Sequence, residues 1–479
     1  MYASLKDEGR MWGLVIFILN YYERKMNLSL EMINSFEKSP ALAISNVARA
    51  AGIKQALRSQ EVKPPPRLYT HTLEDVPVED QGKSGRCWMY AFSNLIRRNI
   101  LTTYKIKEFE ISHTYLQFFD KLERANTFLN FIRSTRDSHI DDRLLNYMFV
   151  NLLSDGGQWH MAVCLTEKYG IVPLSAMPEV YDTQQSGFMN NTLRQMLFSF
   201  AYDIRNNLTT HTDNLYFMQR IYNVLVVCMG RPPTEFEWVY QTEDLDIISE
   251  TLTPLQLLKK YIGPPLESFV TLIHCPCSTK ELSKVYTVEN NINIEGSTPS
   301  RYLTVSEKEL EDMTKASIKA DTPVWFGCEY HAMNDSKHGI LHSKLYNYSL
   351  LGDTVDVSDK ARAIDIHYAE VNHAMLITGV CDLRGQTSHW KVQNSHGKKS
   401  NTKDGYIDMS NCWFRRHVYQ IAVPKSILSE KLRDLIEHEV EIPLAPWDIM
   451  GNLATVRTLS EAGLESAQFV NCLYRREIL

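Results

Sequence analysis

The chain has 479 residues, of which 44% are hydrophobic and 23% are charged, the balance of an ordinary soluble globular protein. This length allows one large domain with elaborations or two to three smaller domains. The formal net charge of −6 excludes a global basic field that would hold nucleic acid or an anionic membrane.

The N-terminal segment contains a hydrophobic run, from Trp12 to Leu19. It is too short to span a bilayer, which needs about 20 apolar residues. Acidic residues precede it and no small-residue cleavage site follows, so we interpret it as neither a membrane span nor a signal peptide. Residues 28 to 60 then have a helical pattern that stops at Gly52, and residues 63 to 81 are proline-rich and extended.

The stretch "QGKSGRCWMYAFSNL", residues 81 to 95, places a cysteine between a turn and a helix. Apolar residues recur with helical spacing from Trp88 to Ile100, and polar residues fill the other face. Cys87 is therefore expected at the helix N-terminus, where unpaired N–H groups favour a thiolate. A lowered thiol pKa is what a nucleophilic cysteine needs, and Gly85 leaves room for a substrate backbone.

Helical patterns dominate residues 106 to 270. From about residue 321 the period changes to two and β-branched residues accumulate, which predicts strands. The sequence therefore predicts an α+β fold, a helical part followed by a sheet part. A nucleophile on a helix needs a base from elsewhere, and the sheet is a plausible source.

His373 opens an apolar strand in "VNHAMLITGV", and Asn394 ends the next strand in "WKVQNSHG". The two strands are expected to be neighbours, which places the imidazole beside the amide. An amide oxygen can fix the tautomer of the imidazole and aim its other nitrogen at a sulfur. Gln81 can stabilise an oxyanion together with the Cys87 N–H. Taken singly, these residues also fit a core histidine, a turn asparagine and a loop glutamine.

The nine cysteines are odd in number and thinly spread, which favours reduced thiols in the cytosol over a disulfide framework. Their one tight cluster is "HCPC", residues 274 to 277. No second pair of Cys or His residues follows it at the spacing of a zinc site. Two ordinary loop cysteines are therefore the favoured interpretation. We expect neither a metal nor another cofactor.

In chain order, Gln81, Cys87, His373 and Asn394 resemble the papain-like cysteine peptidases. The long Cys–His separation and "SGRC" point to one branch, the bleomycin hydrolase group. The resemblance covers roughly residues 28 to 454 and includes "FEISHTYLQFFDKLERAN", "DGGQW", "GYIDMSNCWFRRHVYQIAV" and "PWDIMGNLA".

The resemblance implies a cytoplasmic aminopeptidase that acts on peptides with a free N-terminus and assembles as a homohexamer with its active sites facing an inner channel. Cys87 would be the nucleophile, His373 the base, Asn394 its orienting partner and Gln81 the oxyanion donor. Substrate would contact Gly156, Gly157 and Ala454, the last at the end of a C-terminal arm in the cleft.

The papain-like core would combine a helical half and an antiparallel sheet half with a large helical insertion. The expected segments are an N-terminal extension (1–27), a hook and lead-in (28–80), the cysteine helix (81–105), a mainly helical insertion (106–320), the sheet half (321–440), the C-terminal arm (441–454) and an extra tail (455–479).

Two departures from the group bear on function. His396 stands where the group usually has a tryptophan that shields the Asn–His contact, so a wetter and weaker contact is expected. The chain also continues past Ala454 to residue 479. Two alternatives therefore stay open: a peptidase with relaxed endo/exo selectivity, and a non-catalytic or nucleic-acid-binding barrel, which the acidic balance disfavours.

Overall fold

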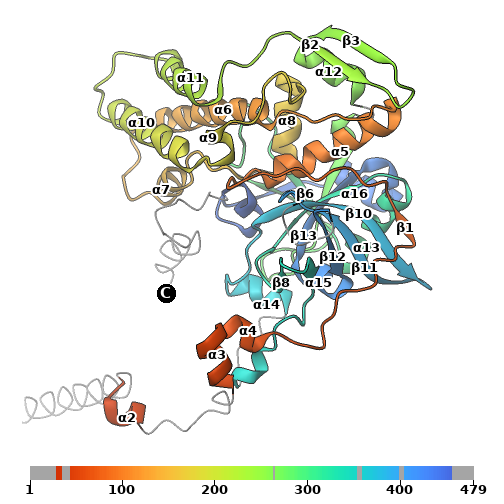
Figure 1. Cartoon of the computed structure of the whole chain (residues 1–479). Helices are drawn as coiled ribbons and strands as arrows, with labels where there is room; N and C mark the ends of the chain where they lie inside the picture. The colour runs from red at the N-terminus through yellow and green to blue at the C-terminus, as the bar shows by residue number, and fades with distance from the viewer. Residues whose placement is uncertain (1–27, 35–43, 263–264, 353–358, 399–403, 456–479) are drawn as a thin grey trace, which may run out of the picture. The chain divides into compact units, whose positions relative to one another are not determined.

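The computed structural model describes residues 28–34, 44–262, 265–352, 359–398 and 404–455. The chain divides into two compact units (Figure 1). The smaller unit consists of residues 1–59 and 346–355, and the larger of residues 60–345 and 356–479. Within the described ranges, no helix is both long and apolar enough to cross a membrane.

The smaller unit contains the short helices α2 (Leu30–Asn34), α3 (Ser45–Ala51) and α4 (Ile53–Leu57) and the 3₁₀ turn η3 (Tyr348–Leu351). Gly52 separates α3 from α4 with φ of +87°, a left-handed conformation that favours glycine. The Asn347 N–H donates to the carbonyl of Leu57 over 2.8 Å, which joins the two chain segments of this unit.

Helices α6 to α12 of the larger unit gather on one side of the sheet, with α5 between them and the strands (Figure 1). Ser112 caps α6, and Thr253 and Gln256 form a capping box at α12. The elements are α5 (Cys87–Tyr104), α6 (His113–Ser134), α7 (Arg143–Val150), α8 (Trp159–Tyr169), α9 (Tyr181–Gln184), α10 (Gly187–Arg205), α11 (Leu215–Met229), α12 (Pro254–Tyr261) and the hairpin β2 (Phe236–Gln241) and β3 (Ile247–Leu252).

A mixed sheet forms the rest of the larger unit, in the order β14-β5-β6-β4-β13-β7-β10-β11-β12-β9-β8, with β1 also paired to β10. The pairs β14/β5, β4/β6 and β12/β9 are parallel. The strands are β1 (His71–Thr72), β4 (Phe269–Ile273), β5 (Val285–Val288), β6 (Arg301–Thr304), β7 (Val324–Cys328), β8 (Asn334–Asp335), β9 (Ile340–Leu341), β10 (His373–Leu383), β11 (Gln386–Gln393), β12 (Tyr406–Ser410), β13 (Val418–Pro424) and β14 (Glu441–Leu444).

The elements that flank or follow these strands are α13 (Glu307–Lys319), α14 (Lys360–Asp365), α15 (Asn411–His417), α16 (Glu430–His438) and the 3₁₀ turns η2 (Leu266–Ser268), η4 (Lys425–Ile427) and η5 (Ile449–Thr455). The α+β prediction is confirmed. Apart from β1, however, the strands of the sheet begin at Phe269, well before residue 321. Strands β4, β5 and β6 are short apolar runs, which periodicity alone does not separate from buried helix.

Helix α5 begins at Cys87, as the sequence predicts, and it packs against β10 and β7. Its polar residues are also buried: Ser93, Asn94, Arg97 and Arg98 are at most 5% exposed. The lead-in chain and the loop after α5 cover that face, where Arg97 donates to the carbonyls of Pro77 and Phe109. Helix α5 is therefore buried from Cys87 to Arg98, which fixes the position of its first residue.

Strands β10 and β11 are antiparallel, and Leu376 pairs with Gln393. The start of β10 and the end of β11 therefore lie at the same edge of the sheet. His373, at the first position of β10, pairs on its other side with Cys328 of β7. This register brings His373 and Asn394 together.

Candidate active site

Cys87 is buried, with 1% of its surface exposed. Its thiol lies 3.9 Å from the carbonyl oxygen of Gly85. Hydrogen bonding with the backbone N–H groups of Ala374, Trp88 and Cys87 itself favours the thiolate. Because Ala374 follows His373 directly, the first residue of α5 and the start of β10 meet at the sulfur.

Burial acts against the charged forms of both Cys87 and His373. It raises the pKa of Cys87 to about 11, and the backbone N–H groups only partly offset this. It also lowers the pKa of His373 to about 3, helped by the neighbouring His396, while Asn394 acts in the opposite direction. Neither Cys87 nor His373 is therefore favoured to carry a charge by itself at this site.

His373 and Asn394 lie side by side, with 2.9 Å between Nε2 and Oδ1. The Asn394 Nδ2 group donates to the Tyr330 hydroxyl over 3.2 Å, so both ends of the amide are engaged. The Tyr330 ring is 4.6 Å from the His373 ring, and the His396 ring stacks on His373 at 5.6 Å. The amide therefore has one orientation, which holds the imidazole in place.

The expected wet Asn–His contact is not found. His373 and Asn394 are each 6% exposed, although His396 stands where a tryptophan was expected. Tyr330 shields the two side chains from solvent in place of the tryptophan. It is itself only 6% exposed and contacts both His373 and Asn394. The sequence analysis missed Tyr330, which follows β7 and carries no local signal of this role.

Gln81 is also buried and is tied to the turn after Asn394. Its backbone N–H donates to the Ser395 carbonyl over 2.9 Å, and its side-chain oxygen accepts from the Ser395 hydroxyl. The Nε2 group donates to the Ser84 carbonyl over 2.5 Å. One of the two Nε2 hydrogens is thus committed to the loop before Cys87.

Arg86, the residue before Cys87, is buried and forms a two-pronged ion pair with Glu179 at 3.0 and 2.9 Å. Its Nε donates to the Ser84 hydroxyl over 2.9 Å, and its Nη2 also reaches the Gln81 carbonyl. Arg86 therefore braces the loop that carries Gln81 against the segment before α9.

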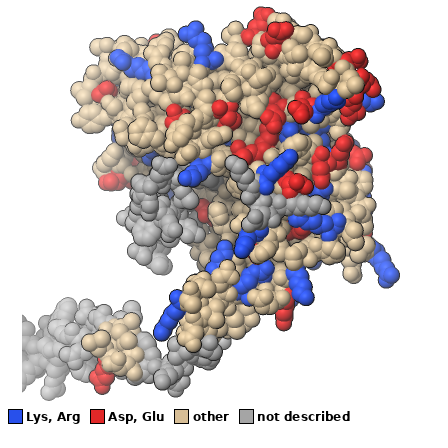
Figure 2. All heavy atoms as spheres, in the orientation of Figure 1, with Lys and Arg blue, Asp and Glu red and all other residues tan. Residues whose placement is uncertain are grey.

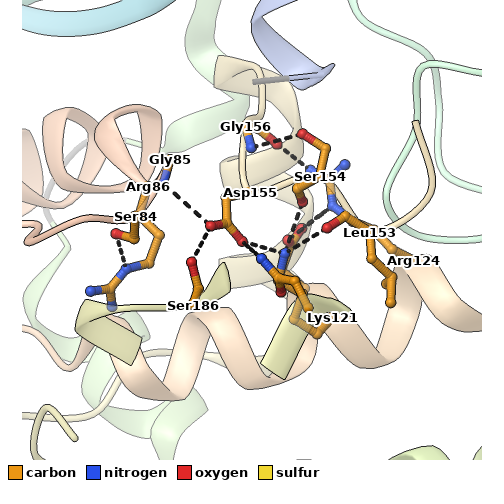
Figure 3. Close-up of polar contacts among 12 residues, drawn as sticks. Ser84, Gly85, Arg86, Lys121, Arg124, Leu153, Ser154, Asp155, Gly156 and Ser186 are labelled. Carbon is orange, nitrogen blue, oxygen red and sulfur yellow. Dashed lines mark hydrogen bonds and ion pairs between the residues drawn. The ribbon is translucent and has the colours of Figure 1, made fainter. Parts of the chain in front are cut away.

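Asp155 connects the same loop to the helical side (Figure 3). One carboxylate oxygen accepts from the Gly85 N–H over 3.3 Å and from the Ser186 hydroxyl. The other accepts from Lys121 over 2.6 Å and from Asn190 over 2.8 Å. The side chains of Lys121 and Asp155 are both fully buried. A charge-assisted network thus holds the backbone two residues before Cys87.

Gly156 and Gly157 follow this carboxylate. A Cβ at Gly157 would lie 2.4 Å from the Trp88 ring, so only glycine allows this approach. The Trp88 indole donates to the Asp155 carbonyl over 2.7 Å, and the Gly156 carbonyl accepts from Arg124 over 2.6 Å. The predicted glycines therefore lie against the residue that follows Cys87.

The C-terminal arm ends close to this segment. Gln158 donates to the Met450 carbonyl of η5 over 2.8 Å. Ala454 is buried and lines a pocket together with Arg124 and Met161. Cys87 and His373, both described, do not line this pocket. Ala454 thus shares this pocket with Arg124, which donates to the Gly156 carbonyl.

Comparison with known proteins gives the family. A model of the Peptidase C1-like family matches residues 26–451. The chain belongs to the Peptidase C1-like family. Members with similar sequences include "Aminopeptidase C" of Listeria monocytogenes, 34% identical over 81% of this chain and 88% of that protein. "Aminopeptidase C" of Streptococcus thermophilus is 34% identical over 86% of this chain and 95% of that protein.

A crystal structure of pepw from Lactobacillus rhamnosis agrees with this fold. Its TM-score is 0.85 at 33% identity, and the match covers 89% of this chain and 99% of that chain. The predicted papain-like fold is thereby confirmed. This Peptidase C1-like chain is a cysteine aminopeptidase of the bleomycin hydrolase type, as the sequence predicts.

Proposed function

We propose that Cys87, His373, Asn394 and Gln81 carry the peptidase reaction. Cys87 gives its proton to His373 and attacks the carbonyl of the first peptide bond of the substrate. The resulting oxyanion lies between the Cys87 N–H and the second Nε2 hydrogen of Gln81. The observation that supports this most is the buried His373–Asn394 pair at the edge of the sheet where α5 begins.

His373 then protonates the leaving amine, and a thioester joins the acyl group to Cys87. Water hydrolyses the thioester, with His373 taking its proton as general base. Asn394 accepts from Nε2 of His373 throughout, so the ring presents Nδ1 for these transfers. The bond between Asn394 and Tyr330 keeps the amide from turning over as the ring changes charge.

The restriction to N-terminal residues is proposed to come from the C-terminal arm. A carboxylate at Ala454 would pair with the substrate ammonium group. The docking of η5 through Gln158 and the burial of Ala454 support this placement. Gly156 and Gly157 would contact the substrate backbone between the arm and Cys87.

We also propose a cytoplasmic homohexamer. Support comes from the smaller unit, whose helices expose large apolar side chains: Leu30 is 79% exposed, Val47 51% and Ile53 50%. Exposed apolar surface of this kind is typical of an interaction site. Native mass spectrometry tests the assembly, and the variant Leu30→Glu, Val47→Glu, Ile53→Glu should then be a monomer.

A nucleic-acid-binding role has less support. On the face in Figure 2, Lys and Arg side chains lie among Asp and Glu side chains, and the net charge of the chain is −6. Strong binding of phosphate backbones requires clustered Lys and Arg.

The Cys87→Ala variant tests the proposed nucleophile. It should lose turnover of aminoacyl-amide fluorogenic substrates and should no longer react with a cysteine-directed epoxide, while its melting temperature stays close to that of the wild type. Cys228→Ala, on α11, is the matched control and should keep both properties. Retained turnover in Cys87→Ala would overturn the assignment.

A further inference from the structure

The loop after β4 holds two cysteines in a tight turn. The Cys277 N–H donates to the Cys275 carbonyl over 2.9 Å, a three-residue turn centred on Pro276. Proline suits this turn because its fixed φ of about −65° is close to the value that the turn needs. Such a turn brings the flanking Cα atoms within the range that a disulfide spans, about 4.4–6.8 Å. The two sulfurs are already 4.0 Å apart.

Both cysteines are free thiols, and their surroundings differ. Cys275 is only 4% exposed, whereas Cys277 is partly exposed beside the exposed residues Ser278 and Thr279. Polar groups gather at the Cys277 sulfur: the Thr279 hydroxyl at 3.4 Å and the Lys280 ammonium at 3.7 Å. The accessible sulfur is therefore the one beside a cation.

The Lys280 ammonium is held in place. It pairs with Asp448 over 2.6 Å, and its side chain is 1% exposed. Hydrogen bonding from Cys275, then Thr279 and Lys280, places the pKa of Cys277 below its usual range although burial opposes this. The pKa of Cys275 is raised, first by its hydrogen bond to Cys277 and then by burial. The pair thus combines an accessible thiolate with a buried thiol.

We propose that Cys275 and Cys277 form a thiol–disulfide exchange site that accepts the disulfides of small thiols. The Cys277 thiolate attacks one sulfur of the small disulfide, so that a mixed disulfide forms and one small thiolate leaves. Cys275 loses its proton to that thiolate and attacks the Cys277 sulfur. A Cys275–Cys277 disulfide forms and the second small thiolate departs, taking a proton from water. Two electrons have then passed from the protein to the small disulfide.

The sequence alone favoured two ordinary loop cysteines here. The turn at Pro276, the short sulfur–sulfur distance and the buried Lys280 are what distinguish the pair from that interpretation. Metal binding is a weaker reading, because the described residues contain no group of three or more His, Cys, Asp or Glu side chains suited to hold an ion.

The test uses the full-length Cys87→Ala protein, which excludes reaction at the proposed catalytic thiol and needs no peptidase activity. The protein is equilibrated with mixtures of oxidised and reduced glutathione, blocked with N-ethylmaleimide and digested with trypsin. The peptide from Tyr261 to Lys280 contains both cysteines and no other cysteine. As oxidised glutathione increases, this peptide should lose two hydrogen atoms and carry neither maleimide nor glutathione.

Single variants separate the two roles. With Cys275→Ser, Cys277 should accumulate the glutathione adduct, because no resolving thiol remains. With Cys277→Ser, Cys275 should stay reduced and react slowly. If both cysteines instead take up maleimide at every glutathione ratio, or if Cys275→Ser gains no adduct, the exchange site is disproved.

Lys280→Gln tests the cation. It should slow formation of the disulfide at pH 7 by about tenfold, since a smaller fraction of Cys277 is thiolate. Lys284→Gln is the matched control. Lys284 lies on the same loop as Lys280, but it pairs with Glu439 and has no part in the proposed step. Equal rates in these two variants would overturn the role of Lys280.

Discussion

The burial of both Cys87 and His373 is the decisive feature at the scale of single residues. A helix N-terminus was expected to lower the thiol pKa, and backbone N–H groups do act in that direction. Burial outweighs them, because a charge of either sign loses hydration in this enclosed site. We therefore expect the thiolate to depend on His373 as its partner.

Replacing His373 by Ala tests this dependence. Below about pH 11 burial keeps an unpaired Cys87 in its thiol form, so the thiolate fraction should grow with rising pH up to that value. At pH 7, alkylation of Cys87 by iodoacetamide should be at least about 100-fold slower than in the wild type. His396→Ala retains His373 and should change the rate far less. Equal rates in wild type and His373→Ala would show that Cys87 ionises alone.

Replacing Asn394 by Ala should lower kcat by about 10- to 100-fold and leave KM nearly unchanged, because Asn394 orients the base and makes no bond to substrate. Steady-state kinetics on an aminoacyl-amide substrate measures both. Tyr330→Phe removes only the hydroxyl that accepts from Asn394, so its loss should be smaller. An unchanged kcat in Asn394→Ala would contradict the orienting role.

The sequence was sufficient to predict these neighbours because a short antiparallel connection leaves few choices of register. His373 opens one strand and Asn394 ends the next, so they had to meet. Tyr330 was not predictable in this way, because its contact depends on β7 lying next to β10. Nothing in the residues around Tyr330 indicates that neighbour.

At the scale of elements, the Lys121–Asp155 ion pair joins α6 to the loop that precedes α5. Ser186 and Asn190 bring the start of α10 to the same carboxylate. The helical side of the larger unit therefore contributes directly to the position of Cys87, although none of these residues is proposed to touch substrate.

Replacing Asp155 by Asn should lower the free energy of unfolding by about 3–5 kcal/mol, because an unpaired, fully buried Lys121 remains. The kcat should fall as well, since a single amide oxygen cannot accept from both Gly85 and Lys121. Urea denaturation and kinetics on the same preparation measure the two effects. Asp312→Asn breaks the pairs of a surface carboxylate with Lys308 and Lys315 and should cost far less. Similar losses in both variants would contradict the network.

Local signals predicted where α5 begins, but not that its polar face is buried. A turn followed by helical spacing is readable from neighbouring residues, whereas the cover over Arg97 comes from Pro77 and Phe109 in flanking chain. The early start of the sheet was missed for a related reason. Strands β5 and β6 are four residues long, which is too short to show a period.

At the scale of the whole molecule, the chain continues beyond the proposed end of the arm. Residues 456–479 lie outside the described residues, so the expected tail stays a prediction. The family match ends at residue 451, close to Ala454. A backbone that continues past Ala454 presents an uncharged amide where the proposed function needs a carboxylate.

We expect the enzyme to trim itself near Ala454. The intact masses of wild type and Cys87→Ala should then differ by the mass of residues 455–479. A chain made to end at Ala454 is the control, and it should cleave free N-terminal residues but not N-acetylated peptides. If wild type retains the tail and still cleaves only N-terminal residues, another acidic group holds the amine. If it retains the tail and cuts internal bonds, the selectivity is relaxed.

The buried Lys121–Asp155 pair also makes the site depend on the completed fold. The contacts of the Asp155 carboxylate that accepts from Gly85 form only when α6, the segment before α8 and the start of α10 have come together. We therefore expect a refolding chain to gain peptidase activity only after these three segments have docked.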